Sequence, residues 1–418
     1  MKESIAYNKW LIILVIGLLV FVVLLNFIVD PLDIYRIGEK KGFNKIKPEV
    51  ASYSRLSKPI QTELLQPKSI AFGSSRVEYG MNMSHSAWQK PALNNALSGT
   101  SIYDISRLFQ HAIATAPIET AVIGVDLFMF NVYREKYKTI NEKVLATSHD
   151  GVRSPLHKSQ QLLLTLFSKD IFLASLTTLR KQKQKEQRYT KYGQLINSRT
   201  VNKILDKGGF NRIFRNMTKK LPAVLWTECR DGRFSYQGKG ENSLEAFRNI
   251  LTMARDNNVQ LKFFISPTHA WLLEAMDAIG LWQEFEKMKR TLVKEVALAN
   301  EQAGKDFVEL WDFSGYTSYT TEKVPVVGDN KTIMKWYIDP SHYSDDLGDI
   351  MLGVMLSNHN VSDDLGSMLR SDNIENHLSV IRTLRRQYRQ MNTEVLTLTK
   401  KMAVDVLLAR KKSGIVCD

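Results

Sequence analysis

The stretch Ser69-Ile70-Ala71-Phe72-Gly73-Ser74-Ser75-Arg76 decides how this chain folds. Its first four residues form an apolar run without alternation, which predicts a short strand buried on both faces, as in a parallel sheet covered by helices. The turn that follows carries small polar side chains at the carboxyl end of the strand, where open parallel sheets bind their ligands. The stretch therefore predicts both a fold class and the position of a site.

Similar apolar runs recur along the chain and alternate with stretches of helical periodicity. Strands are expected at 69–72, 120–125, 259–265 and 306–311, and helices at 47–66, 102–115, 243–258 and, as a pair, 270–303. This alternation predicts an α/β fold, doubly wound, with a mostly parallel sheet flanked by helices over residues 47–360. Residues 131–242 interrupt it as a basic helical insertion.

The amino terminus carries twenty residues without a charge, from Trp10 to Val29. A helix of that length is about 30 Å long, the thickness of a bilayer's hydrocarbon core. A cleaved signal peptide, the alternative, would have a shorter apolar region and a small-residue cleavage site, and none follows Asn26. We expect a single-pass signal-anchor at 10–29, a short cytoplasmic tail at 1–9, and an extracytoplasmic, periplasmic domain on the inner (cytoplasmic) membrane.

The composition indicates a globular protein, 44% hydrophobic and 24% charged, with a net charge of +14. Residues 158–220 hold fifteen Lys or Arg and three Asp or Glu, so most of the excess charge lies there. This segment is either a solvated helical face or a patch that meets lipid headgroups or another anionic polymer beside the membrane. Because we expect an extracytoplasmic domain, nucleic acid is not an expected partner.

The tail at 370–412 has the periodicity of a helix with a heptad pattern. Apolar residues recur every seven positions at Ile374, Ile381, Tyr388, Val395 and Met402, and three positions later at Leu384, Met391 and Leu398. A coiled coil, which would make a homo-oligomer through this helix, and a helix docked on the body both fit the pattern.

Two short motifs carry the chemistry. Ser75 lies in the turn after the first strand, and Asp339-Pro340-Ser341-His342 follows the last predicted strand. A serine nucleophile needs a base to take its proton, and the base needs a carboxylate that fixes its tautomer. Ser75, His342 and Asp339 supply one of each, so they are the candidate catalytic residues.

This layout, G-x-S after the first strand and D-x-x-H after the last, resembles that of the SGNH (GDSL-type) hydrolases. Residues 95–101, NALSGTS, are similar to the family's second block. The resemblance implies an oxyanion hole made by the backbone N–H groups of Ser75 and Gly99, because glycine lets the backbone approach a substrate closely.

The third block departs from the family pattern, which is G-x-N-D with the Asn as a further oxyanion donor. Here it reads Gly124-Val125-Asp126-Leu127, and an ionised Asp126 cannot donate a hydrogen bond. Asn131, a few residues on, is a candidate substitute for that donor. Either the oxyanion hole has only two donors, or Asp126 does something else, such as pair with Arg76.

The single anchor and the placement of the motifs, over 1–130 and 243–355, resemble one branch of that family. The branch contains the D-alanyl transfer protein of lipoteichoic-acid synthesis and the alginate O-acetylation proteins, which work beside a membrane-bound O-acyltransferase. The resemblance implies an O-acyltransferase or esterase that modifies a cell-envelope polysaccharide. A non-catalytic, tethered polymer-binding or assembly protein of the same fold is the alternative.

The remaining candidates are weaker. Arg76, Asp126 and His269 are possible substrate contacts by position, and His269 could equally begin a helix. No P-loop, strand-borne G-x-G-x-x-G or H-E-x-x-H motif is present, and Cys229 and Cys417 are the only cysteines. We therefore expect neither a cofactor nor a metal.

Overall fold

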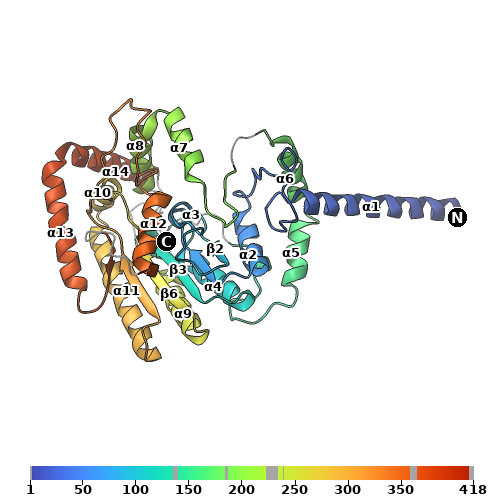
Figure 1. The fold of residues 1–418 in the computed structure, drawn as a ribbon, viewed down its shortest axis with the longest axis horizontal. Coiled ribbons are helices and arrows are strands. Elements are labelled where there is room, and N and C mark those ends of the chain that lie inside the picture. Colours follow the sequence, from blue (N-terminus) through green and yellow to red (C-terminus); the bar gives the residue numbers. More distant parts are fainter. Residues whose placement is uncertain are drawn as a thin grey trace. The chain divides into compact units, whose positions relative to one another are not determined.

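The computed structural model describes residues 2–134, 140–183, 187–222, 234–238, 240–357 and 365–413 (Figure 1). The chain forms two compact units: the α1 unit, residues 1–66 and 140–191, and the sheet unit, residues 67–139 and 192–418. This division differs from the predicted α/β domain over 47–360. The predicted helix at 47–66 belongs to the α1 unit together with the apolar amino-terminal helix, and not to the sheet unit. The predicted insertion at 131–242 is likewise divided between the two units.

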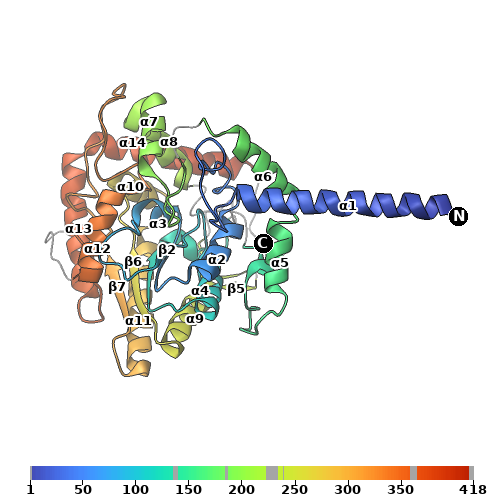
Figure 2. The same ribbon diagram turned by 45° about the vertical axis from the view of Figure 1, so that its right-hand side comes forward.

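The α1 unit is built of helices. It contains α1 (Lys2–Val29), α2 (Ser54–Leu65), η2 (Glu142–Val144), α5 (His157–Thr165) and α6 (Lys169–Arg180). The 25 residues Ile5–Val29 of α1 form a helix long and apolar enough to cross a membrane. Figures 1 and 2 show α1 leaving the unit as an isolated helix, with α5 and α6 on either side of its base.

Buried polar groups close the carboxyl end of α1. The Asp30 carboxylate accepts the backbone N–H groups of Ile34 at 2.9 Å and Tyr35 at 3.1 Å, which folds the chain back sharply. The Lys47 ammonium donates to the carbonyl oxygens of Val29 at 3.0 Å and Asp30 at 2.7 Å. A cation on the last carbonyls of a helix is favoured by the helix dipole. The apolar helix therefore ends in a fixed polar turn.

The sheet unit contains a mostly parallel six-stranded sheet in the order β2-β1-β3-β6-β7-β8. The strands are β1 (Ser69–Phe72), β2 (Ala92–Asn94), β3 (Thr120–Val125), β6 (Gln260–Ile265), β7 (Val308–Asp312) and β8 (Ser367–Met368). Only β8 is antiparallel. The four predicted strands are β1, β3, β6 and β7, whereas β2 and β8 are too short to show a sequence period.

The strand order places β1 and β3 at the topological switch point. From β1 the chain moves outward to β2 and then returns to β3 on the other side of β1. Parallel crossovers are right-handed, so the connecting helices cover both faces of a sheet that reverses in this way. Ligands bind beside the strand ends at such a point. Ser75 and Asp126 directly follow these two strands.

Helices pack around the sheet in two groups. α4 (Ile102–Thr115), α9 (Ser243–Asp256) and α11 (Trp282–Ala303) contact one another in series, and α3 (Ser75–Gly80) contacts α12 (Asp345–Ser357). The remaining elements of the unit are η1 (Leu127–Phe130), α7 (Asn197–Asp206), α8 (Gly209–Leu221), α10 (Ala270–Ala278), α13 (Ile374–Met391), α14 (Thr393–Ser413) and a small hairpin, β4 (Gln237–Gly238) with β5 (Glu241–Asn242).

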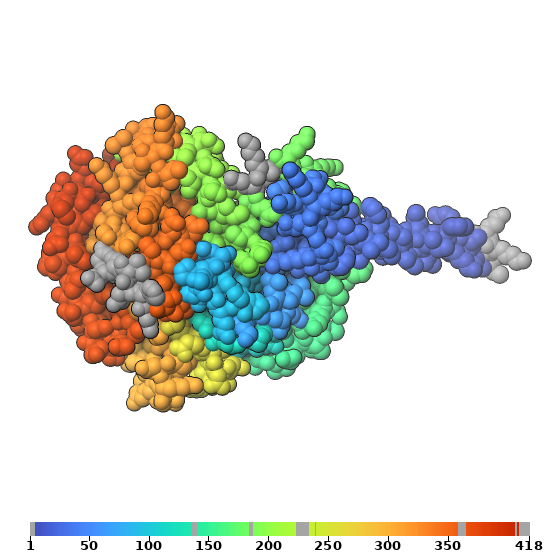
Figure 3. Space-filling view, viewed as in Figure 1, coloured from blue at the N-terminus to red at the C-terminus, as the bar shows by residue number. Residues whose placement is uncertain are grey.

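The heptad-patterned tail is docked on its own sheet unit. Ile374, Ile381 and Tyr388 are buried, whereas Met391 is 77% exposed. Arg389 on α13 pairs with Glu274 on α10 at 2.7 Å. Figure 3 shows the tail, in red, packed directly against orange segments of the same unit. The docked helix is therefore the observed alternative, and a homo-oligomer through this helix stays a prediction.

We predict that Gly348→Ala destabilises the sheet unit. A Cβ atom at Gly348 on α12 would lie 1.7 Å from the carbonyl oxygen of Gly80 on α3, and backbone cannot move aside as a flexible side chain can. Such overpacking costs about 1–3 kcal/mol. Urea unfolding measures the loss in the free energy of unfolding. The control is Asp346→Ala, at an exposed position of the same helix. Equal stability of the two variants would contradict the close approach.

Candidate active site

Three side chains predicted from the sequence meet beside the carboxyl end of β1. The Ser75 hydroxyl lies 2.7 Å from Nε2 of His342, and Nδ1 of His342 lies 2.7 Å from a carboxylate oxygen of Asp339. An ionised carboxylate only accepts hydrogen bonds, so Nδ1 carries the ring proton and Nε2 can accept the hydroxyl proton of Ser75. The arrangement is that of a nucleophile, a base and an orienting carboxylate.

The turn between Asp339 and His342 folds back on itself. The second Asp339 oxygen accepts the backbone N–H groups of Ser341 at 2.8 Å and His342 at 3.0 Å. Burial alone would raise the pKa of Asp339, but His342 and these N–H groups outweigh burial and hold that pKa below its ordinary value. The carboxylate therefore stays charged beside the imidazole.

Close packing fixes the distance between Ser75 and His342. Gly80, at the end of α3, lies against the ring of Tyr343, where an added Cβ would come within 1.8 Å of a ring carbon. Gly73, before Ser75, has φ +149°, and a Cβ there would meet Val77 at 2.3 Å. Gly80 thus lets α3 lie directly against the turn that carries His342, and Gly73 lets α3 fold closely over the ends of β1 and β3.

A buried ion pair, Arg76 with Asp126, connects the parts of the site. Both residues are almost completely buried, at 4% and 3% exposure. The Arg76 guanidinium also donates to the hydroxyls of Thr268 at 3.0 Å and Ser341 at 3.1 Å, and the Ser74 hydroxyl donates to Asp126 at 3.2 Å. One guanidinium thus links the ends of β1, β3 and β6 to the turn that carries His342.

This pairing confirms the alternative role that the sequence suggested for Asp126. The Asp126 carboxylate pairs with the Arg76 guanidinium and neutralises it. The two side chains are therefore positioning residues in the structure, and a direct substrate contact by either one stays a prediction. Sequence reasoning missed Thr268 and Ser341, although Ser341 lies inside the D-x-x-H motif and could have been considered.

Gly99 lies in a loop that runs beside the Ser75 turn. The backbone N–H groups of Asn95 and Leu97 donate to Ala71 at 2.8 Å and Gly73 at 2.9 Å, so the loop follows the end of β1. Gly99 has φ +66°, and its carbonyl accepts a 3.0 Å hydrogen bond from Arg134. These contacts hold the peptide in place, and its part in an oxyanion hole stays a prediction.

Asn131 has a structural role in the turn after η1. Its side-chain oxygen accepts the backbone N–H groups of Tyr133 at 3.1 Å and Ser235 at 3.3 Å. The oxygen therefore shapes the local chain, and donation by the amide nitrogen to an oxyanion stays a prediction.

His269 begins helix α10, which confirms one of its two predicted roles. Nδ1 accepts the backbone N–H of Trp271 at 3.2 Å, and Nε2 lies 2.8 Å from the carbonyl oxygen of Glu322. These partners assign the neutral tautomer with the proton on Nε2. Burial disfavours the charged ring and lowers the pKa of His269 to about 4, although the Glu322 carbonyl opposes this. The ring is 1% exposed, and a substrate contact by His269 stays a prediction.

Tyr79 is a further neighbour of the candidate base. Its ring meets the His342 ring edge-on, with 5.2 Å between the centroids, and its hydroxyl lies 3.2 Å from that of Thr200. Tyr79 lies four residues after Ser75, so the helical period of α3 could have indicated that both face the same way. The contact restricts how the imidazole can turn.

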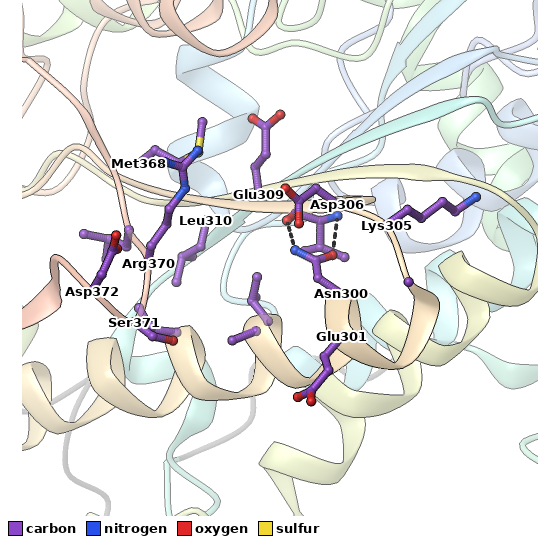
Figure 4. Close-up of a pocket in the computed structure, with 16 residues that line it drawn as sticks. Asn300, Glu301, Lys305, Asp306, Glu309, Leu310, Met368, Arg370, Ser371 and Asp372 are labelled. Atoms are coloured by element: carbon purple, nitrogen blue, oxygen red, sulfur yellow. Dashed lines mark hydrogen bonds between the residues drawn. The ribbon is translucent and has the colours of Figure 1, made fainter.

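A cavity of about 740 Å³ lies elsewhere in the sheet unit (Figure 4). It is bounded by α11, the first half of β7 and residues 368–372. Asn300 holds the edge of β7 there by accepting the N–H of Val308 at 3.1 Å and donating to its carbonyl at 2.9 Å. The cavity is at the amino end of a parallel strand, and none of the predicted site residues lines it.

Comparison with known proteins adds no identity to this geometry. No protein-family model matches the chain, and no curated protein matches it. A function therefore has to be inferred from the side chains and contacts described above.

We predict that Arg76→Met lowers the free energy of unfolding by about 3–5 kcal/mol, because it leaves the Asp126 carboxylate buried without a cation. The double variant Arg76→Met, Asp126→Leu should recover much of this loss, since an apolar pair of similar volume often replaces a buried ion pair at little cost. Urea unfolding of both variants measures the difference. A single variant as stable as the parent would show that the pair is not buried.

A second prediction concerns pH. The folded-state pKa of His269, about 4, lies below the unfolded value of about 6.5, so the unfolded chain takes up the proton first. The contribution of the neutral, buried His269 ring to the free energy of unfolding is fully present above pH 6.5 and is lost as pH falls towards 4. Between pH 7 and pH 5 the loss is about 2 kcal/mol. His269→Asn keeps an acceptor for the helix start and should lack this part of the pH dependence. Parallel pH profiles of unfolding for both proteins would contradict the prediction.

Proposed function

We propose that this protein is a serine acyl-ester enzyme. The observation that carries the proposal is the chain of two 2.7 Å hydrogen bonds from Ser75 through His342 to Asp339. The orienting carboxylate stabilises the imidazolium that forms when the hydroxyl loses its proton. The contacts of Arg76 support this reading, because they hold the nucleophile and the base in one geometry before a substrate arrives.

The proposed reaction has two halves that share one base. The Ser75 oxygen attacks an acyl carbonyl carbon while its proton passes to Nε2 of His342, and backbone N–H groups of Ser75 and Gly99 hold the oxyanion. The bond to the leaving oxygen then breaks, and His342 returns the proton to that oxygen. An acceptor hydroxyl next attacks the acyl-enzyme carbonyl and gives its proton to Nε2 of His342. The bond from the acyl carbon to the Ser75 oxygen then breaks, and His342 returns the proton to that oxygen.

The acceptor decides between the two enzyme classes. A sugar or polyol hydroxyl makes the protein an O-acyltransferase, and water makes it an esterase. The apolar α1, the basic residues and the resemblance to the alginate O-acetylation branch favour transfer to a cell-envelope polysaccharide. In this proposal α1 spans the inner membrane, the sheet unit is extracytoplasmic, and a membrane-bound O-acyltransferase is a partner.

The described part of the basic segment offers a surface for an anionic polymer. Helix α8 buries Phe210, Phe214 and Thr218 in the sheet unit. Its exposed positions include Arg212, Arg215, Lys219 and Lys220. A helix with one apolar and one cationic face can bind polymer while it stays packed, which supports the polymer-binding part of the proposal. The run at 180–188 belongs to the other unit, and its Lys185 lies outside the described residues.

The test of the chemistry is labelling and activity of substituted proteins. We expect an active-site phosphonate to label the parent at Ser75 and to leave Ser75→Ala unlabelled. Ser84→Ala, at an exposed serine of the same unit, is the matched control and should label normally. Ser75→Ala and His342→Ala should each lower acyl transfer by about 10³-fold or more, without adding in the double variant, because nucleophile and base act as a unit.

Asp339→Asn should be less damaging than either, since it changes the tautomer more than the position of the ring. Thermal melts of all variants control for folding. Complementation of a deletion strain decides between the classes of function. Full activity of Ser75→Ala there would exclude the acyl-enzyme and favour the non-catalytic, polymer-binding alternative.

A further inference from the structure

Helix α5 is amphipathic in the reverse sense to a helix of a water-soluble protein. Its buried side chains are Gln161 and Thr165, whereas Leu162 and Leu163 are 46% and 59% exposed. Gln161 donates to the carbonyl oxygen of Val144 at 2.8 Å, and the Thr165 hydroxyl lies 2.7 Å from that of Tyr35. Polar groups are thus satisfied inside the α1 unit while leucines face outward.

The outward apolar face continues through the turn into α6. Its members, which we call the hairpin face, are Leu156, Leu162, Leu163, Phe167 and Leu173, each 46–60% exposed. Large exposed apolar side chains gathered on adjoining elements, rather than scattered singly, indicate a site of contact. The hairpin face therefore needs an occupant.

The position of the hairpin along α1 identifies that occupant. The Asn26 amide donates to the carbonyl oxygen of Leu166 at 2.8 Å and accepts from the Ser175 hydroxyl at 2.9 Å. Asn26 lies three residues before the end of α1 at Val29, which is about 4.5 Å along a helix axis. Interfacial helices bury their apolar faces about 5–10 Å into the boundary between headgroups and acyl chains. The turn of the hairpin lies at that depth.

The side of α6 that faces α1 also suits a lipid environment. It includes Ala174, Ser175 and Thr178, all buried, and small residues of this kind let helices approach closely in membranes. Exposed basic residues lie at the start of α5 (Lys158), at the junction of the two helices (Lys169) and at the end of α6 (Arg180 and Lys181). Long basic side chains of this kind reach up to anionic headgroups while their stems stay in the interface.

We propose that the α5–α6 hairpin lies in the membrane interface beside α1, with the hairpin face at the acyl-chain boundary. The chain bends by 47° between the two helices. Together they are long and apolar enough to form one broken span, whereas with nine and twelve residues each alone is too short to cross a bilayer. The hairpin is thus a second, interfacial membrane contact that fixes the orientation of the α1 unit. This inference rests on the part of the proposed function in which α1 spans the membrane.

The test uses the full-length protein in phosphatidylcholine vesicles with phosphatidylglycerol. Single-cysteine variants, made with Cys229→Ser and Cys417→Ser, carry an environment-sensitive dye at Leu163→Cys, Phe167→Cys, Leu64→Cys or Val15→Cys. Leu64 is the matched control, a leucine 52% exposed on α2 of the same unit. Lipids with a spin-label quencher near the headgroup or deep in the chain report the depth of each dye.

We expect the dyes at Leu163→Cys and Phe167→Cys to be quenched at least about twofold more by the shallow quencher than the dye at Leu64→Cys. The dye at Val15→Cys should respond most to the deep quencher. The shallow quenching should persist in 1 M salt, because charge attraction at an exposed surface is screened within about 3 Å there, whereas apolar insertion is not.

Three results would overturn the inference. Equal quenching at Leu163→Cys and Leu64→Cys, with Val15→Cys still quenched, would remove the hairpin contact and leave the anchor in place. Loss of the shallow quenching in high salt would show that charge attraction, rather than insertion, holds the hairpin to the vesicle. An unquenched dye at Val15→Cys would remove the transmembrane anchor and the inference together, without touching the chemistry proposed for Ser75.

Discussion

The buried charge of Arg76 is the constraint on which the rest of the site depends. A guanidinium at 4% exposure has to be neutralised and hydrogen-bonded, and its partners are Asp126, Thr268 and Ser341. Arg76 directly follows Ser75, and Ser341 directly precedes His342. The interaction that satisfies the buried charge therefore also sets the distance between the hydroxyl and the imidazole.

Close contact between backbones at glycines also restricts the position of Ser75 relative to His342. Gly80 and Gly348 bring the backbones of α3 and α12 together, and Tyr343 is held between α3 and the turn of His342. Protein interiors at this density do not deform gradually, so Ser75 and His342 keep their places without a ligand. The imidazole is further restricted by the edge-on ring of Tyr79. Such preorganisation is what acyl transfer by a serine nucleophile needs.

The α1 unit combines a small apolar core (Leu32, Ile34, Ile60 and Ile171) with buried polar groups at the base of α1. Asn26, Asp30 and Lys47 satisfy backbone and hydroxyl groups in the interior, while leucines of the hairpin face point outward. In water this distribution would be unfavourable, because it buries polar groups and exposes apolar ones. Beside an apolar helix long enough to span a bilayer, this distribution is consistent with contact between the exposed leucines and lipid. The candidate chemistry and the candidate membrane contact thus belong to different units.

Local patterns in the sequence determined the apolar helix, the strands β1, β3, β6 and β7, and the place of Ser75 beside the carboxyl end of β1. That Asp339 and His342 meet Ser75 was predicted from the residue types and the order of the motifs, because both lie well beyond the end of β7 at Asp312. Tertiary structure alone decided that Asp126 pairs with Arg76 rather than taking another role, that Ile381 and Tyr388 dock within the chain, that β2 and β8 join the sheet, and that the basic segment is divided between the units. The physical reason is that a residue pattern specifies which face of an element is apolar or charged, whereas the surface that covers this face comes from residues distant in sequence. A heptad of apolar residues is the same whether its neighbour is a second copy or its own sheet unit.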